Sequence, residues 1–358
     1  MSAPSNSTTI LPGADSRAIA VVSGKGGSGK TIIAAVMAEI LDAAGHSVIL
    51  VDADTGTAGL TFYFGLELVT NTSVGLSDVL VDTWIDPDRI LGLTRPIKDF
   101  KRTRFLSIGD YRRFPRDFPG VGLADLLGRI TEILRASSEY VIFDCRGGLD
   151  DESLAVCKAV DDILLVVETD ATSYQASQRL VDVLAQNNVS AKLKGFMINK
   201  VFDDPSVVAR NGTAVFRTQY LTAIPFDFDA MRAFFVGKVP DLYSTFGVHV
   251  HHGLHKAYSD GVKEPNGRVY RFDEYSEIGF VNLDSLRGGI IVSLLLVAFS
   301  ALLYTYWFRP ESHAYISVPL AIGVLSVLGL MGSISSVRQA IGEAVNSLIT
   351  KTLLIRRR

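Results

Sequence analysis

The residues with the clearest chemical potential form a glycine-rich loop near the start of the chain. Residues 24–31 read GKGGSGKT and satisfy the GxxxxGK[ST] pattern. Glycines let backbone N–H groups turn inward around phosphate oxygens, and a following helix directs its positive N-terminal end at the same anion. We expect Lys30 to contact the β- and γ-phosphates of a nucleotide and the Thr31 hydroxyl to coordinate magnesium. The predicted phosphate-binding residues are Gly24, Gly26, Gly27, Ser28, Gly29, Lys30 and Thr31.

This loop requires a strand before it and a helix after it, and the sequence supplies both. Short β-branched runs alternate with longer amphipathic stretches from residue 18 to about residue 228. The alternation predicts βαβ units, and the fully apolar strands indicate a parallel sheet covered on both faces. We therefore expect a mostly parallel, doubly wound α/β sheet. Its predicted strands are 18–23, 47–52, 104–108, 140–144, 162–168, 194–199 and 221–224, and its predicted helices include 30–44, 121–137, 171–187 and 206–219.

A second lysine in the loop, Lys25, carries further information. With it, the segment resembles the deviant Walker A loop of the MinD/ParA family of ATPases. The resemblance covers roughly residues 18–245 and implies the fold of a P-loop NTPase that uses ATP and Mg²⁺. It also implies that Lys25 reaches across a nucleotide-sandwich homodimer, so that Lys25 and Lys30 both act in catalysis.

Two acidic segments continue the resemblance. The run VILVDAD is similar to the second family motif, whose acidic residues fall on Asp52 and Asp54, and it implies that Asp54 orients the attacking water. The run YVIFD is similar to the Walker B strand, which implies that Asp144 holds magnesium through water. An acidic residue that ends an apolar strand needs a partner, and a magnesium ion is a suitable one. We expect Thr31, Asp52 and Asp144 to form the metal site.

Two later segments resemble the part of the family site that binds the base. The run FMINK is similar to the strand end whose asparagine, here Asn199, recognises adenine. The run IPFD is similar to the loop that closes over the base and contributes Pro225 and Phe226. All these residues fall at the carboxyl ends of predicted parallel strands, where open α/β sheets bind their ligands.

One residue departs from the family pattern. The family usually places a proline two residues after the Walker B aspartate, whereas this chain continues from Asp144 through Cys145 to Arg146. An arginine at this position either alters hydrolysis or supplies a charge near the phosphates.

Composition excludes several classes of protein. Apolar residues make up 48% of the 358 residues, and charged residues make up 20%, which excludes an intrinsically disordered chain. The formal net charge of −3 argues against a wholesale nucleic-acid binder, so DNA is not a favoured partner. Only two cysteines, Cys145 and Cys157, are present, which excludes a disulfide scaffold and favours a reducing compartment.

The C-terminal part predicts a membrane anchor. Residues 288–308 and 314–337 contain no charged side chain, and about 20 apolar residues suffice to span a bilayer. A basic tail favours the cytoplasmic side. The predicted organisation is a disordered lead-in at 1–17, a P-loop domain at 18–245, a linker at 246–286, a two-helix transmembrane hairpin at 287–337 and a basic tail at 338–358. We expect both termini on the cytoplasmic face of a bacterial inner membrane.

Two further clusters have no role in this scheme. Eight Lys and Arg residues lie between positions 95 and 116. Two interpretations of this stretch are open: it is a solvated face, or it contacts lipid, an acidic partner or DNA. Four histidines lie at positions 249, 251, 252 and 255, a density that suggests transition-metal affinity, but a solvated linker is the simpler interpretation.

These features together predict a membrane-anchored ATPase that dimerises with ATP and thereby organises, localises or regulates a membrane-associated assembly. The expected partners are a second copy of the chain, the lipid bilayer and an unidentified membrane or cytosolic protein. Two alternatives stay open: a protein similar to the bacterial tyrosine kinases that share this phosphate loop, and a nucleotide-binding scaffold with little turnover.

Overall fold

A computed structural model describes residues 16–81, 85–110, 112, 122–148, 150–202 and 204–265. The predicted membrane hairpin, the basic tail and the lead-in before residue 16 lie outside these residues. Within the described ranges, no helix has both the length and the apolar composition needed to cross a bilayer.

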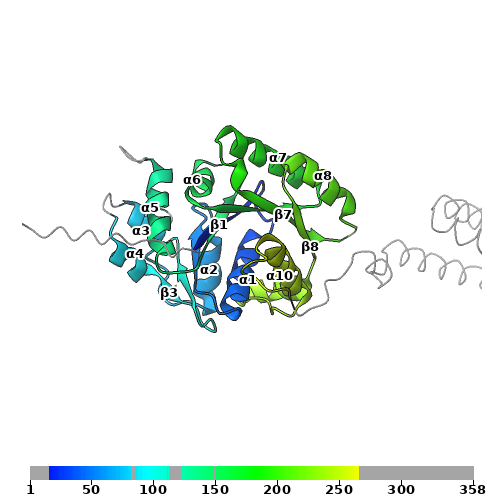
Figure 1. Cartoon of the computed structure of the whole chain (residues 1–358). Helices are drawn as coiled ribbons and strands as arrows, with labels where there is room; N and C mark the ends of the chain where they lie inside the picture. Colours follow the sequence, from blue (N-terminus) through cyan, green and yellow to red (C-terminus); the bar gives the residue numbers. More distant parts are fainter. Residues whose placement is uncertain are drawn as a thin grey trace, which may run out of the picture. The chain divides into compact units, whose positions relative to one another are not determined.

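The described chain alternates strands and helices, as the sequence predicts (Figure 1). All seven predicted strands and all four predicted helices are confirmed, with ends shifted by up to three residues. In chain order the elements are β1 (Arg17–Ser23), α1 (Lys30–Ala43), β2 (Val48–Ala53), α2 (Gly59–Glu67), α3 (Leu76–Val81), α4 (Pro87–Leu93), β3 (Arg95–Pro96), β4 (Thr103–Leu106), α5 (Leu123–Arg135), β5 (Tyr140–Gly147), α6 (Asp151–Ala159), β6 (Asp162–Glu168), α7 (Ala171–Gln186), β7 (Leu193–Val201), α8 (Ser206–Phe216), β8 (Tyr220–Pro225), α9 (Phe228–Phe235) and α10 (Thr245–Ala257).

The strands form one eight-stranded sheet in the order β3-β4-β2-β5-β1-β6-β7-β8. Every pairing is parallel except the antiparallel pair of β3 with β4 at one edge. The strand that leads into the phosphate loop, β1, lies between β5 and β6. Parallel pairing brings the carboxyl ends of these strands to one edge, where the site is built.

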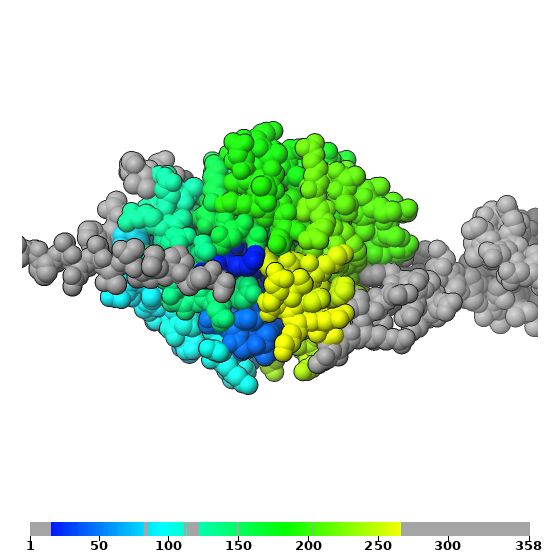
Figure 2. Space-filling model, viewed as in Figure 1, coloured from blue at the N-terminus to red at the C-terminus, as the bar shows by residue number. Residues whose placement is uncertain are grey.

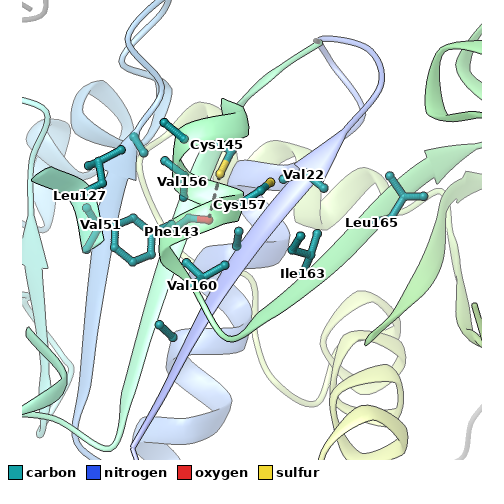
Figure 3. Packing of buried hydrophobic residues seen from close by; sticks show 14 of the residues in the cluster. Val22, Val51, Leu127, Phe143, Cys145, Val156, Cys157, Val160, Ile163 and Leu165 are labelled. Carbon is teal, nitrogen blue, oxygen red and sulfur yellow. Dashed lines mark hydrogen bonds between the residues drawn. The ribbon is translucent and has the colours of Figure 1, made fainter. Parts of the chain in front are cut away.

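Two layers of helices cover the sheet. Helices α5, α6 and α7 pack their apolar side chains on one face, and α1, α2 and α10 pack on the other. Figure 1 shows α6, α7 and α8 on the opposite side of the sheet from α1 and α10. Figure 3 shows part of the first face, where Phe143 and Cys145 of β5 lie among side chains from β1, β6 and α6. Burial raises the pKa of the Cys145 and Cys157 thiols, which are core residues.

The predicted linker begins with a core helix, which corrects the domain boundary. Helix α10 starts at an N-cap, Ser244, whose hydroxyl accepts from the Gly247 N–H at 3.1 Å. Its buried residues Val250 and Leu254 pack in the core layer over β8 and α1, and Val262 beyond the helix is also buried. In the space-filling view, the yellow surface of α10 adjoins blue N-terminal segments (Figure 2). The compact domain therefore continues past residue 245.

The histidine cluster lies on this helix, so the interpretation as a solvated linker is wrong. His249 is 1% exposed, and its imidazole is therefore part of the core. The rings of His251 and His255 are hydrogen-bonded to the carbonyls of Lys263 and Val262, at 3.0 Å and 2.6 Å. These contacts tie the chain after α10 back onto the helix.

Three arginines of the basic stretch stabilise the sheet edge. Arg95 donates to the Gly92 carbonyl at 2.6 Å, and Arg102 donates to the Gly45 carbonyl at 2.7 Å. Arg104 donates to the carbonyl of Thr94 at 2.7 Å. These side chains satisfy backbone acceptors at the ends of helices and turns, which gives them a structural role.

Candidate nucleotide-binding site

The phosphate loop connects β1 to α1 and is shaped by glycines. Gly29 has a φ of 90°, and a Cβ atom built there would lie 2.2 Å from Asn199 Nδ2. Gly24 is packed against the backbone of α7, where a Cβ atom would lie 2.2 Å from the carbonyl carbon of Ala176. A larger residue fits at neither position. The loop is thus held between β7 and α7, in the glycine-dependent conformation that phosphate-binding loops use.

A cavity of about 520 Å³ opens at the carboxyl edge of the sheet and has the size of a small-ligand site. It brings together residues from the phosphate loop, the β2–α2 connection, the end of β5 and the segment from β7 to α10. Of the predicted site residues, it is lined by Gly26, Gly27, Gly29, Lys30, Thr31, Asp54, Asn199, Pro225 and Phe226. Gly24, Lys25, Ser28, Asp52 and Asp144 are not among the described residues that line it.

The two acidic residues of the second motif hold the β2–α2 connection in place. Asp52 is fully buried, and its carboxylate accepts the N–H groups of Asp54 at 2.9 Å and Thr61 at 2.7 Å. Burial raises the pKa of Asp52 to about 6. Asp54 accepts the N–H groups of Gly56 at 2.9 Å and Thr57 at 3.0 Å. Both carboxylates therefore fix the backbone of this loop beside the cavity.

Asp144 is the buried group whose surroundings best fit a metal ion. It is 1% exposed, and neither carboxylate oxygen has a hydrogen bond of good geometry with a described residue, although the Thr31 hydroxyl lies close enough to lower its pKa. It pairs in register with Asp52 on the neighbouring strand. Burial raises the pKa of Asp144 to about 8, and the nearby Lys30 ammonium offsets part of this effect. An unpartnered buried carboxylate beside Asp52 and Thr31 suits Mg²⁺, which binds through one or two carboxylates and keeps several waters.

Lys25 lies outside the cavity and is paired within its own chain. Its ammonium is 3.3 Å from Glu168 and 3.1 Å from Asp170, and these hydrogen bonds raise its pKa. Glu168 ends β6, and Asp170 is the N-cap of α7. Lys200 contacts the second oxygen of Glu168 at 2.8 Å. The structure thus shows Lys25 in an intramolecular ion-pair network.

Asn199 lies between the phosphate loop and the far end of the cavity. It is 3% exposed, and its Nδ2 donates to the Ser28 carbonyl at 2.8 Å. This amide therefore supports the loop directly, in addition to lining the cavity. Ser28 itself is buried, and its hydroxyl has no hydrogen-bond partner among the described residues.

An aromatic group marks the far end of the cavity. The Phe226 ring stacks on Phe202, with ring centroids 4.9 Å apart and planes at 22°. It also meets the edge of Phe228 at 4.9 Å. Aromatic rings of this kind offer a flat surface on which a heterocyclic base can stack.

Several lining residues were not predicted. The sequence analysis assigned no role in the site to Met231 and Phe234 of α9 or to Phe246 of α10, all of which line the cavity. A signal for α9 was present, because Asp227 caps it by accepting the N–H groups of Asp229 and Ala230. Asp residues of this kind, directly before an apolar run, indicate a helix start.

Comparison with known proteins fits this geometry. Residues 19–240 match the model of the CobQ/CobB/MinD/ParA nucleotide binding domain, which is more than half of the chain. The chain belongs to this family. The MinD/ParA resemblance seen in the phosphate loop is therefore confirmed at the level of the family.

Individual relatives are distant. An uncharacterised ATP-binding protein of Methanocaldococcus jannaschii is 25% identical over 194 residues, which cover 52% of this chain and 65% of that protein. The chloroplastic septum site-determining protein MinD homologue of Arabidopsis thaliana is 28% identical over 178 residues, covering 49% of this chain and 52% of that protein. The chain thus spans about half to two thirds of the length of these curated relatives.

The fold is shared with solved family structures. The septum site-determining protein MinD of Pyrococcus horikoshii, complexed with Mg-ADP, aligns with a TM-score of 0.56 at 20% identity. The alignment covers 68% of this chain and 95% of that one. The α/β P-loop fold with its mostly parallel eight-stranded sheet is therefore that of the family.

Proposed function

We propose that this protein is a membrane-anchored ATPase whose ATP state controls dimerisation. The observation that carries the proposal is the cavity in which Lys30 and Thr31 of the phosphate loop, Asp54 of the β2–α2 connection and Asn199 and Phe226 meet. Family membership and the Mg-ADP bound by the Pyrococcus horikoshii protein support ATP with Mg²⁺ as the ligand. Dimerisation, hydrolysis and anchoring are proposals that extend beyond the shared fold.

Lys30 lies at the start of α1, where its ammonium and the helix N-terminus both favour the β- and γ-phosphates. Mg²⁺ would be held by Thr31, Asp52 and Asp144, and it would neutralise charge that develops on the phosphate oxygens. Asp54 would release its hydrogen bonds with the β2–α2 loop, accept a hydrogen bond from the attacking water and so orient that water. Catalysis of this kind depends on positioning and electrostatics rather than covalent chemistry.

Lys25 supplies the link to dimerisation. In the single chain its ammonium is satisfied by Glu168 and Asp170. Reaching a partner's phosphate requires Lys25 to leave these two carboxylates. ATP in the partner's site offers a more strongly charged acceptor than either carboxylate, so the exchange is favoured only when a second loaded copy is present.

We further propose that the charge-free segments 288–308 and 314–337 anchor the domain as a membrane hairpin, with both termini cytoplasmic. The support is their length and apolar composition and the basic tail that follows them. Because a spanning hairpin does not detach reversibly, the nucleotide cycle would act on assembly at the membrane rather than on recruitment to it. The protein partner of this assembly stays unidentified.

The test uses full-length protein in detergent with three variants. Lys30→Ala should abolish ATP binding while the domain stays folded. Asp54→Ala should bind ATP and accumulate as a dimer, whereas Lys25→Ala should bind ATP and stay monomeric. Isothermal titration measures binding and analytical ultracentrifugation measures the oligomer. Unchanged ATP affinity in Lys30→Ala would overturn the site, and a nucleotide-independent monomer in both wild type and Asp54→Ala would overturn the switch.

A further inference from the structure

Arg146, which replaces the expected proline, lies where two functional loops meet. It follows Asp144 by two residues at the end of β5. Its guanidinium lies against the β2–α2 connection, since a Cβ atom built on Gly56 would be 2.5 Å from its Nε. Gly56 in turn donates its N–H to Asp54 at 2.9 Å. The arginine side chain therefore touches the loop that holds Asp54.

The side chain is only weakly held by its own chain. Its Nε is 3.5 Å from Asp150, and its Nη1 is 3.9 Å from Glu152, which also accepts the Thr55 hydroxyl at 3.1 Å. The Arg146 side chain is 46% exposed. Half-exposed ion pairs at such distances contribute little free energy, so a stronger acceptor can displace them.

Arg146 also lines the nucleotide cavity, together with Lys30, Asp54 and Thr57. The next residue, Gly147, packs directly on the phosphate loop, because its Cβ position lies 2.6 Å from the Gly26 Cα. The backbone at Arg146 is therefore anchored beside the loop, while its guanidinium can turn within the cavity.

The strand order fixes which part of a nucleotide this guanidinium meets. Asn199 and Phe226 follow β7 and β8 on one side of β1, whereas Arg146 follows β5 and the Asp54 loop follows β2 on the other side. With the base at Asn199 and Phe226 and the phosphates on the loop after β1, the phosphate chain runs toward β5 and β2. The terminal phosphate then lies nearest to Arg146.

We propose that Arg146 contacts the terminal phosphate of a nucleoside triphosphate and so makes the site discriminate triphosphate from diphosphate. The guanidinium would leave Asp150 and Glu152 and bind two phosphate oxygens instead. Its paired, coplanar N–H donors match two acceptor oxygens on one phosphate. This inference rests on the proposed nucleotide site and adds a residue that selects the bound nucleotide.

Titration of ATP and ADP into full-length protein tests the inference. Arg146→Ala should weaken ATP binding by roughly tenfold or more and change ADP binding by less than about twofold, because a hydrogen bond to a charged group is lost only for the triphosphate. Arg146→Lys, which keeps the charge without the paired donors, should fall between. Glu152→Gln should tighten ATP binding, because it removes a competitor for the guanidinium. Arg129→Ala, at an exposed arginine of α5, is the matched control.

The outcomes separate this inference from the proposed function. Equal weakening of ATP and ADP in Arg146→Ala would show a structural role and overturn the inference. An unchanged ATP affinity in that variant would also overturn it, and both results would leave the nucleotide site standing. Unchanged ATP affinity in Lys30→Ala would instead overturn the site and this inference together.

Discussion

The buried His249 predicts a specific dependence of stability on pH. It is 1% exposed on α10, and burial lowers its pKa from 6.5 to about 4, although a hydrogen bond with the Ala223 backbone raises it in part. In the unfolded chain the ring regains its ordinary pKa. The unfolded state therefore binds a proton between pH 6.5 and 4, where the folded state does not. Stability contributed by the neutral ring is complete above pH 6.5 and is lost as pH falls toward 4.

The size of the effect follows from the two pKa values. At about 1.4 kcal/mol per pH unit, the interval between 6.5 and about 4 corresponds to a loss of about 3 kcal/mol. By pH ~5, about 2 kcal/mol of this should already be lost. This is a large fraction of the total stability of a typical domain.

The comparison of wild type with His249→Leu isolates this group, because every other ionisable residue is common to both proteins. Pulse proteolysis of the full-length protein in urea, at pH ~8 and ~5, measures the free energy of unfolding of the domain. Wild type should lose about 2 kcal/mol more than His249→Leu between the two conditions. Equal losses in the two proteins would refute the argument that the buried ring is kept neutral by the fold.

Three further predictions concern the site and the anchor. Gly29→Ala should weaken ATP binding in titration calorimetry, because the left-handed backbone costs roughly 1–2 kcal/mol and the new methyl group meets Asn199; retained affinity would contradict the packing of the loop. Asp144→Asn should abolish Mg²⁺-dependent phosphate release, because the amide cannot supply a negatively charged oxygen to the metal, and it should raise the thermal midpoint of the nucleotide-free protein at pH ~9, above the Asp144 pKa of about 8, where it removes a buried charge; a lowered midpoint at that pH would argue against that account. Alkaline carbonate washing of membranes should leave both wild type and Lys30→Ala in the pellet, and truncation after Leu283 should release the domain; release of the full-length chain would exclude a spanning hairpin.

The strand–loop–helix context of the glycine-rich loop was predictable from sequence because its determinants are local. The glycine loop, the strand before it and the helix after it follow one another in the chain, so spacing alone specifies them. The strands before Asp54, Asn199 and Pro225 were also predictable, since their apolar runs are visible in one sequence, whereas the roles given to these three residues came from the resemblance to family motifs. Their convergence on one edge follows from parallel pairing.

The sequence analysis missed helix α10 because histidines lie between its apolar residues along the chain. Phe246, Val250, Leu254 and Ala257 recur at helical spacing and are all buried. The histidines between them suggested a solvated segment, yet His249 is as deeply buried as these apolar residues. The helical spacing was thus present in the sequence, whereas the burial of His249 follows from tertiary packing of α10 against β8.

The contacts of Arg146 and Lys25 could not be predicted for a different reason. Arg146 meets Gly56, and Lys25 meets Glu168, across roughly 90 and 140 positions of chain. Such pairs depend on the register of neighbouring strands and on loop conformations that sequence patterns do not specify. The sequence identified both residues as unusual, and the structure shows what each of them touches.

The position of β1 has a consequence for how the site opens. Because β1 is hydrogen-bonded to β5 on one side and β6 on the other, its N–H groups donate alternately to the two neighbours, and each is released only when an interior strand pairing breaks. Exchange of these amides with deuterium should therefore proceed only through global unfolding, with the same opening free energy whether the amide lies near or far from the phosphate loop. A nucleotide that binds only the folded chain raises the free energy of global unfolding, so it should slow the exchange of the β1 amides by the same factor all along the strand, in addition to any local slowing in the phosphate loop.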